Sequence, residues 1–476
     1  MDNTDTPKRR AWVFPTSLAV FWMFCALNAL LKLTYAPDNR IPYPVGLDSN
    51  CYYAFARSLF FDHDLNFAND YEFIARTQPA GTAGPFAELL KANPANPGNV
   101  FNAGTGIAAL PFLAAAWVLD GARTIISGAT PASGFSSLYV FAFHLASITY
   151  GAVALYLAFR MLRRWFEPPL AAVACWATLL CGPMLFYMAA ETSMSHCFGA
   201  FFGTAGLLAW LNWRESEGRR AAWFALLSGV CIGFAVCIRP YNAPVVIVLA
   251  EPLLRQIIRR SGPSRWLSTL VAGIGLFLGF LPQMVAWKVQ TGSWIANTTN
   301  YQFYLLPPNA LNVLFARRHG LFFWAPAYLI ALLGLVLSLR HYRHPAVALL
   351  AVFLGVTYMY GNWWYWWLGF SFGMRGYVDY PAIFAFGFAA AIGWIATNLG
   401  RRAILIAWEV TALFFIINVH LLIAFTGGVT YVDGPLYWLD TISHGKEYKA
   451  QIRRLVAPWS DFAPERRVSL FASPPP

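Results

Sequence analysis

Apolar residues dominate the chain in long runs, and short clusters of arginine and lysine separate most of these runs. A helical run of about 17 to 25 residues can cross the hydrocarbon core of a bilayer, which is about 30 Å thick. The runs lack the alternation of a membrane β-barrel, so the pattern indicates an all-α polytopic fold. We predict about eleven transmembrane helices, near residues 12–34, 135–159, 170–188, 196–213, 222–238, 241–254, 266–287, 320–339, 345–360, 378–398 and 403–425.

The basic clusters give these spans a direction, because arginine and lysine concentrate in the cytoplasmic connections of membrane proteins. With the N-terminus in the cytoplasm, every second connection falls on such a cluster, and an odd number of crossings leaves the C-terminus outside. The chain then divides into a transmembrane domain, 1–426, and a short external tail, 427–476, with an amphipathic helix near 446–456. The basic clusters lie at 8–10, 160–164, 214–220, 255–265, 340–343 and 401–402.

Two apolar segments do not fit a simple crossing. Residues 103–119 are short for a span and contain Gly104, Gly106 and Pro111. A full crossing here would move the next basic cluster to the outside, so we predict a re-entrant or interfacial hairpin. Pro240 and Pro244 open another short span, which predicts a bent entry where the backbone faces a cavity.

Composition supports the membrane assignment and excludes two other classes. Hydrophobic residues make up 58% of the chain and charged residues 12%, whereas about a quarter of residues are charged in soluble proteins. The net charge of +12 comes from clusters at span ends and does not form one basic face, so nucleic-acid binding is not indicated. The cysteines show no CxxC or other metal-ligand spacing, which argues against a zinc site or a disulfide framework.

The first external loop, 35–102, is the most informative segment because it is acidic and also rich in aromatic residues. The spacing predicts a helix over 50–61 with Tyr52 on its apolar face. Asp48 comes just before this helix, where it could cap the helix end or act as a general base toward a hydroxyl at the rim of a cavity. The acidic residues of the loop are Asp38, Asp48, Asp62, Asp64, Asp70, Glu72 and Glu88.

A calcium loop of the EF-hand type does not fit the run from Asp62 to Phe73. Phe67 stands where that loop needs glycine, and Phe73 stands where it needs glutamate. A divalent metal held in another geometry and a solvated, capped turn both remain open for this segment.

Several further polar residues fall on the external side in the predicted topology, and an ionisable residue near a membrane is a functional hypothesis by default. Arginines there need anionic partners, either carboxylates and lipid headgroups or the phosphate of a ligand, which the guanidinium fork suits well. The segment 362–367, NWWYWW, fits an interfacial belt or stacking walls for sugar rings. We predict phosphate binding by Arg239, Arg317, Arg318, His319 and Arg375, and accessory roles for Glu191, His196, Tyr52 and Trp366. The same external set includes Asn242, to which no role is assigned, and Asp379, which with Glu191 is a candidate carboxylate partner of these arginines.

An ordered series of short motifs resembles the bacterial GT-C glycosyltransferases, membrane enzymes related to protein O-mannosyltransferases and aminoarabinose transferases. The resemblance covers most of the chain. Its motifs are Asp48 with the following YYAFARSLFFDHDLNFANDYEF, NAGTGIAALPF at 102–112, ETSMSHCF at 191–198, GFAVCIRPYNAP at 233–244, RRHGLFFWAP at 317–326 and WWLGFSFGMRGYVDYPA at 366–382.

The resemblance implies a GT-C-like core in a bacterial inner membrane, with interfacial helices in the first loop. It implies an inverting transfer of a sugar from a polyprenyl phosphate, with Asp48 as catalytic base and the arginines stabilising the departing phosphate. The acceptor would be a glycolipid, a polysaccharide or a protein. Relatives with paired acidic residues differ here, because Ser49 follows Asp48, so either a divalent metal or arginines could supply the charge.

Two other functions compete with the transferase. A transporter or flippase of a lipid-linked saccharide needs polar groups through the depth of the membrane, whereas the unusual charges here gather on one face. An O-antigen ligase or polymerase-like enzyme tends to carry its large loop late in the chain, whereas this chain carries it first.

Overall fold

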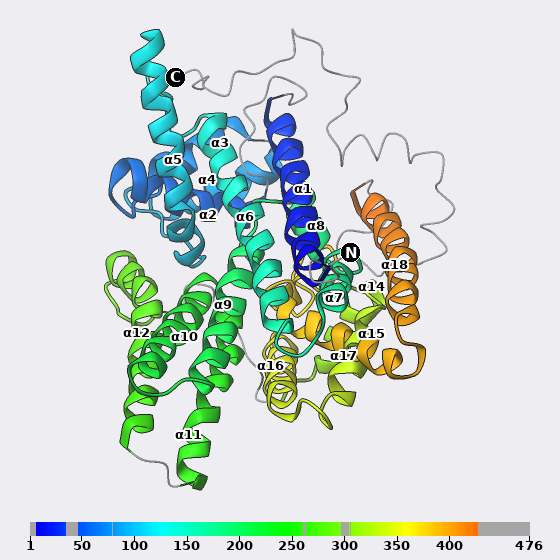
Figure 1. Ribbon diagram of the computed structural model, residues 1–476. Coiled ribbons are helices and arrows are strands. Elements are labelled where there is room, and N and C mark those ends of the chain that lie inside the picture. Colours follow the sequence, from blue (N-terminus) through cyan, green and yellow to red (C-terminus); the bar gives the residue numbers. More distant parts are fainter. Residues whose placement is uncertain are drawn as a thin grey trace.

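The computed structural model describes residues 6–34, 46–78, 80–259, 263–296, 304 and 306–426, and these residues form helices and connecting loops without a strand. The predicted tail helix near 446–456 lies outside them. Figure 1 shows the first-loop helices α2 to α4 beside α5, the group α10 to α12 below them, and α14, α15, α17 and α18 on the other side. The elements are α1 (Thr6–Thr34), α2 (Leu47–Arg57), η3 (Ser58–Asp62), α3 (Ala68–Thr77), α4 (Ala80–Ala92), α5 (Gly104–Ser127), α6 (Ser137–Leu162), α7 (Pro168–Leu180), α8 (Met184–Ala189), α9 (His196–Arg214), α10 (Gly218–Ile238), η4 (Pro240–Val246), α11 (Ile247–Arg259), α12 (Pro263–Thr291), α13 (Ala310–Phe315), α14 (Leu321–Trp324), α15 (Tyr328–Leu337), α16 (Arg343–Gly361), η5 (Arg375–Tyr377), α17 (Pro381–Leu399) and α18 (Arg402–Thr426).

Within the described ranges, eight helices are long and apolar enough to cross a membrane: α1, α5, α6, α10, α12, α16, α17 and α18. All of them except α5 coincide with predicted spans. The prediction of an all-α polytopic membrane protein is therefore confirmed, but the count of eleven crossings is not.

Prolines explain why three predicted spans are broken into shorter pieces. Pro183 separates α7 from α8, and Pro326 lies between α14 and α15. The segment from Pro240 begins as a 3-10 helix and becomes α-helical only at Ile247, which confirms the predicted bent entry. Each proline lacks a backbone donor and its ring disfavours the preceding helical turn.

The hairpin predicted for residues 103–119 is wrong, because this segment is part of one continuous helix, α5. Its glycines serve close packing and not a turn. A Cβ added to Gly104 would lie 2.5 Å from the backbone nitrogen of Ile238, and one added to Gly106 would lie 2.6 Å from the Cβ of Phe55. Pro111 is accommodated inside the helix.

Small residues also join α10 to α12. A Cβ on Gly233 would collide with the backbone oxygen of Leu276, and one on Gly279 would collide with the backbone oxygen of Val230. Removing side chains at such positions lets two membrane helices approach closely and gain dispersion contacts. The pair therefore forms a tight unit at one side of the molecule (Figure 1).

Two buried clusters hold the elements together. The larger one joins α1, α6 to α10 and α14 to α18. The smaller one packs the first-loop helices α2 to α4 on α5 and on the first half of α6. Because α6 and α9 contribute to both clusters, the first loop is fixed against the helical core.

Candidate functional site

The start of α2 brings Asp48 to a residue that lies far away in the sequence. An Nη2 hydrogen of Arg375 is donated to Oδ2 of Asp48 over 3.1 Å, and both side chains are partly accessible, at 14% for Arg375 and 26% for Asp48. Gly46 occupies the N-cap position, with a φ of 88°. The capping alternative for Asp48 is therefore wrong, because its carboxylate lies inside the first turn and faces the arginine.

Arg375 has unused capacity beyond this ion pair. Its Nε atom is buried and has no hydrogen-bond partner within the described part of the chain. A guanidinium presents donors in a fixed fork that matches carboxylate or phosphate oxygens. Arg375 therefore keeps one donor, Nε, that this ion pair does not use.

A second ion cluster lies where α9 begins and α10 ends. Oδ1 of Asp379 lies 2.8 Å from Nδ1 of His196, and its Oδ2 accepts a hydrogen bond of 3.1 Å from Asn242. Arg239 places Nε 4.0 Å from Oδ2 of Asp379 and donates from Nη2 to the hydroxyl of Tyr360 over 3.2 Å. All five side chains are buried.

The donors in this cluster fix where the protons lie. Nη1 of Arg239 lies 2.7 Å from Nδ1 and 2.9 Å from Nε2 of His196, and an arginine can only donate. An ionised Asp379 can only accept, so Nδ1 then carries the ring proton and donates it to Asp379, and Nε2 offers its lone pair to Arg239. Hydrogen bonds thus run in one direction, from Arg239 through His196 to Asp379.

Two glycines make room for this cluster. A Cβ on Gly199, in the first turn of α9, would collide with Oδ2 of Asp379, and one on Gly376 would collide with the ring of Tyr360. Asp379 precedes α17 by two residues, and its carboxylate contacts His196, the first residue of α9. This carboxylate therefore lies beside the starts of both α17 and α9.

Tyr52 lies between the two ion clusters. Its hydroxyl accepts a hydrogen bond of 3.2 Å from Ser195. Burial and the charge of Asp48 raise the pKa of Tyr52, while the charges of Arg239 and Arg375 act against this shift. Asp48, Arg375, Arg239 and Asp379 therefore belong to one electrostatically connected site.

Glu191 lies near the same site. Its Oε1 accepts a hydrogen bond of 2.6 Å from Ser193, and burial raises the pKa of its carboxyl while Lys32 and Arg375 oppose the shift. Tyr187 packs against His196 with ring centroids 4.7 Å apart. The predicted accessory residues Glu191, His196 and Tyr52 thus lie near Arg239 or Arg375.

The other predicted phosphate-binding residues are Arg317, Arg318 and His319, and two of them contact Trp367. Arg318 lies over the ring of Trp367, 4.0 Å from its centroid, and Nδ1 of His319 donates to the backbone oxygen of Trp367 over 2.7 Å. Arg317 is exposed. These contacts join Arg318 and His319 to Trp367.

The tryptophan segment, 362–367, contains both buried and exposed rings. Trp363 packs on Tyr241 with centroids 5.1 Å apart, Trp366 is buried, and Trp364 is 47% exposed. The stacking of sugars on this segment stays a prediction.

The acidic turn of the first loop is neutralised by an arginine of the same loop. Arg57 is buried between Asp62 and Asp70, and its Nε atom lies 2.5 Å from Oδ1 of Asp70. Ser58 donates to Asp64 over 2.7 Å. Within the described residues there is no group of three or more His, Cys, Asp and Glu side chains that could hold a metal.

Sequence reasoning named Asp379 as a possible carboxylate partner of the external arginines, and Asp379 lies 4.0 Å from Arg239. Its hydrogen bonds to His196 and Asn242, which are 183 and 137 residues away, were not predicted. The visible signal for Asp379 was its position four residues after Arg375 and two before a proline. Tyr360 and Tyr187 carried no signal, because buried tyrosines are common in apolar helices.

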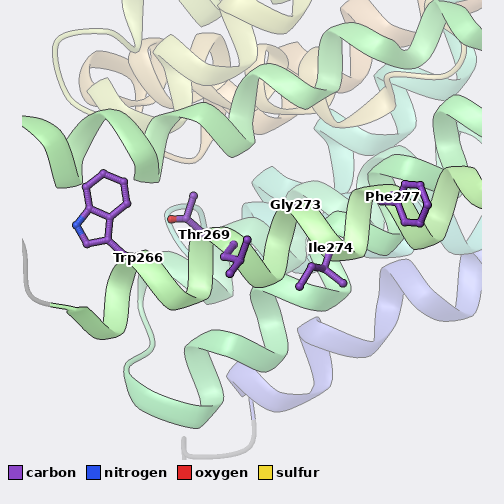
Figure 2. Close-up of a pocket in the computed structure, with 6 residues that line it drawn as sticks. Trp266, Thr269, Gly273, Ile274 and Phe277 are labelled. Carbon is purple, nitrogen blue, oxygen red and sulfur yellow. The ribbon is translucent and has the colours of Figure 1, made fainter.

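A separate groove of about 550 Å³ is lined by residues of α12, as Figure 2 shows. It is almost wholly apolar, which suits the hydrocarbon of a bilayer better than charged chemistry. The lining residues are Trp266, Thr269, Leu270, Gly273, Ile274 and Phe277.

The chain is similar to two solved structures, while no match is found by sequence. No protein-family model matches the chain, and no curated protein matches its sequence. The crystal structure of ArnT from Cupriavidus metallidurans in the apo state is 13% identical, with a TM-score of 0.48, and the match covers 93% of this chain and 74% of that one. The structure of the same ArnT bound to undecaprenyl phosphate gives 13% identity and a TM-score of 0.49, over 93% and 73% of the two chains. Such values do not bear on which residues act, so the class defined here is an all-helical polytopic membrane protein with a buried, paired ion site.

Proposed function

We propose that this protein is an inverting glycosyltransferase that moves a sugar from a polyprenyl phosphate to an acceptor hydroxyl at the external face of the membrane. The single observation that supports this most is the ion pair between Asp48 and Arg375. It joins a carboxylate that can accept a proton to a cation that can bind phosphate, and both are partly accessible.

The reaction needs both groups at the same place. The acceptor oxygen attacks the anomeric carbon of the donor and forms the new glycosidic bond. The bond from that carbon to the phosphate oxygen breaks, and its electron pair stays on the phosphate. Asp48 takes the proton of the acceptor hydroxyl, and Arg375 stabilises the negative charge that develops on the departing phosphate.

In the free protein these two groups neutralise one another. A donor phosphate that binds Arg375 competes with Asp48 for the guanidinium, and the carboxylate becomes available as a base when its partner is shared. The second arginine of the site, Arg239, is engaged by His196 and Tyr360. We therefore assign Arg375 the direct contact with phosphate and Arg239 a supporting charge. Phosphate binding by Arg317, Arg318 and His319 stays a proposal, and Arg318 and His319 contact Trp367.

A flippase fits this arrangement less well. The two acids and two arginines gather at the start of α2, the end of α10 and the segment before α17. The four charges come from helix ends and a connecting segment and do not form a row along one helix. A flippase that carries a lipid headgroup across needs a row of polar or charged groups through the depth of the membrane.

The test uses purified protein and a panel of radiolabelled polyprenyl-phosphate sugars, with loss of label from the lipid as readout. We expect Asp48→Asn to reduce turnover by about a hundredfold or more, which is the range for removing a general base. Lys91→Met serves as a control, because Lys91 pairs with Glu88 at the exposed surface of the same loop. Full transfer by the Asp48→Asn protein, or no transfer by the wild type from any donor, would refute the proposal.

A further inference from the structure

We propose that Asp379 is a positioning residue and counter-ion for Arg239, and that it limits how tightly the site holds the lipid phosphate released by the reaction. This inference rests on the proposed function. It adds a residue and a property that the assignment of Asp48 and Arg375 does not contain.

The geometry gives Asp379 no direct access to a ligand. Its side chain is 1% exposed, and both carboxylate oxygens are occupied, one by His196 and the other by Asn242. A buried carboxylate with these contacts acts through its neighbours. The neighbour that matters is Arg239, which reaches Asp379 through His196 and also lies 4.0 Å from it directly.

The charges in the site give the direction in which Asp379 changes the affinity for phosphate. The site contains two guanidiniums, Arg239 and Arg375, and two carboxylates, Asp48 and Asp379. When phosphate displaces Asp48 from Arg375, Asp379 stays beside Arg239 and continues to offset its positive charge. Without it, the same phosphate would meet one more unit of positive charge in a poorly screened environment and would leave more slowly.

Three variants separate charge from position. Asp379→Asn keeps the shape of the side chain and removes its charge. Gly199→Ala keeps the charge and displaces the carboxylate, because the new methyl group would collide with Oδ2. Gly203→Ala is the matched control, since it lies one turn further along α9 and its Cβ would rest 3.5 Å from the backbone oxygen of Asp379, an ordinary contact.

The measurement is the affinity for farnesyl phosphate, a short polyprenyl phosphate, by calorimetry in detergent. At a pH well above 7, where the carboxyl of Asp379 is ionised, we expect Asp379→Asn to bind about tenfold more tightly than the wild type, as an added charge at short range predicts. We expect Gly199→Ala to bind more weakly, because Arg239 loses its support, and Gly203→Ala to match the wild type. A role in folding alone would lower the bound fraction in Asp379→Asn and could not tighten binding.

A pH series adds a second readout. Burial raises the pKa of Asp379 to about 7, against the opposing effects of Arg239, Asn242 and Arg375. As pH falls through this value, the carboxyl gains a proton and the site becomes more positive, so the affinity of the wild type should approach that of Asp379→Asn. The titratable side chains next to Asp379 include His196, Cys197 on α9 and Tyr380 in the loop before α17. Burial and the charges of Arg239 and Arg375 hold the pKa of His196 well below its usual range, so it stays neutral through this pH series.

The phosphate of the ligand itself titrates near pH 6, and the comparison with Asp379→Asn cancels this contribution because both proteins see the same ligand. Equal affinities for the wild type and Asp379→Asn at every pH would overturn the inference while leaving the proposed function intact. Absence of both farnesyl phosphate binding and sugar transfer in the wild type would overturn the proposed function, and the inference with it.

Discussion

At the scale of single residues, Arg57 shows how a buried charge organises the first loop. It satisfies Asp62 and Asp70 together, and its guanidinium also lies 4.3 Å from the ring centroid of Phe135. The acidic run in the sequence suggested either a metal or a solvated turn. In the structure, the cation beside Asp62 and Asp70 is Arg57 from the preceding helix, α2. The sequence pattern does not reveal this pairing, because Arg57 lies on a mostly buried helix.

We expect Arg57→Met to destabilise the protein by about 3 to 5 kcal/mol, because it leaves Asp70 buried without its partner. The measurement is the midpoint of thermal unfolding in detergent. Adding Asp70→Asn to this variant should recover part of the loss, since the unpaired charge is then removed. Lys91→Met should be close to neutral, because the Lys91–Glu88 pair is exposed. An Arg57→Met protein as stable as the wild type would contradict the assigned role.

At the scale of elements, the apolar runs predict most of the long helices, and prolines decide where the prediction fails. Hydropathy counts residues but does not register that Pro183 and Pro326 divide an apolar run into two helices. It also misjudged α5, where Gly104 and Gly106 permit close packing within a continuous helix. A glycine in an apolar run marks a turn or a close approach, and only the neighbouring elements decide between them.

The approach of α10 to α12 gives a prediction at this scale. We expect Gly233→Ala to lower stability by about 1 to 3 kcal/mol, the usual range for overpacking, because its Cβ would meet backbone and not a movable side chain. Gly273→Ala is the matched control on α12. Nothing lies within 4 Å of its Cβ, and Figure 2 shows it on the open groove. Thermal unfolding of both proteins decides the matter, and equal midpoints would show that the helices do not pack as described.

At the scale of the whole molecule, the site exists only after the chain has folded. Asp48 and Arg375 are 327 residues apart, and His196 and Asp379 are 183 apart. The sequence pointed to Asp48, Arg239, Arg375 and His196 because charged residues are rare in this chain. It offered Asp379 as one possible partner of the arginines but could not decide which groups pair, since pairing depends on how α2, α9 and α17 pack together.

Because the site forms only in the folded chain, a phosphate that binds it should stabilise the whole protein. A ligand that binds only the folded state at about 100 times its dissociation constant adds about 2.7 kcal/mol to the free energy of unfolding. We expect farnesyl phosphate to raise the unfolding midpoint of the wild type and to have little effect on Arg375→Ala, whose site lacks the direct phosphate contact. Arg123→Ala should respond like the wild type, because Arg123 pairs with Asp120 near the end of α5. If the ligand raised the midpoint of Arg375→Ala as much as that of the wild type, phosphate would bind elsewhere, and residues 317–319 would become the first alternative to examine.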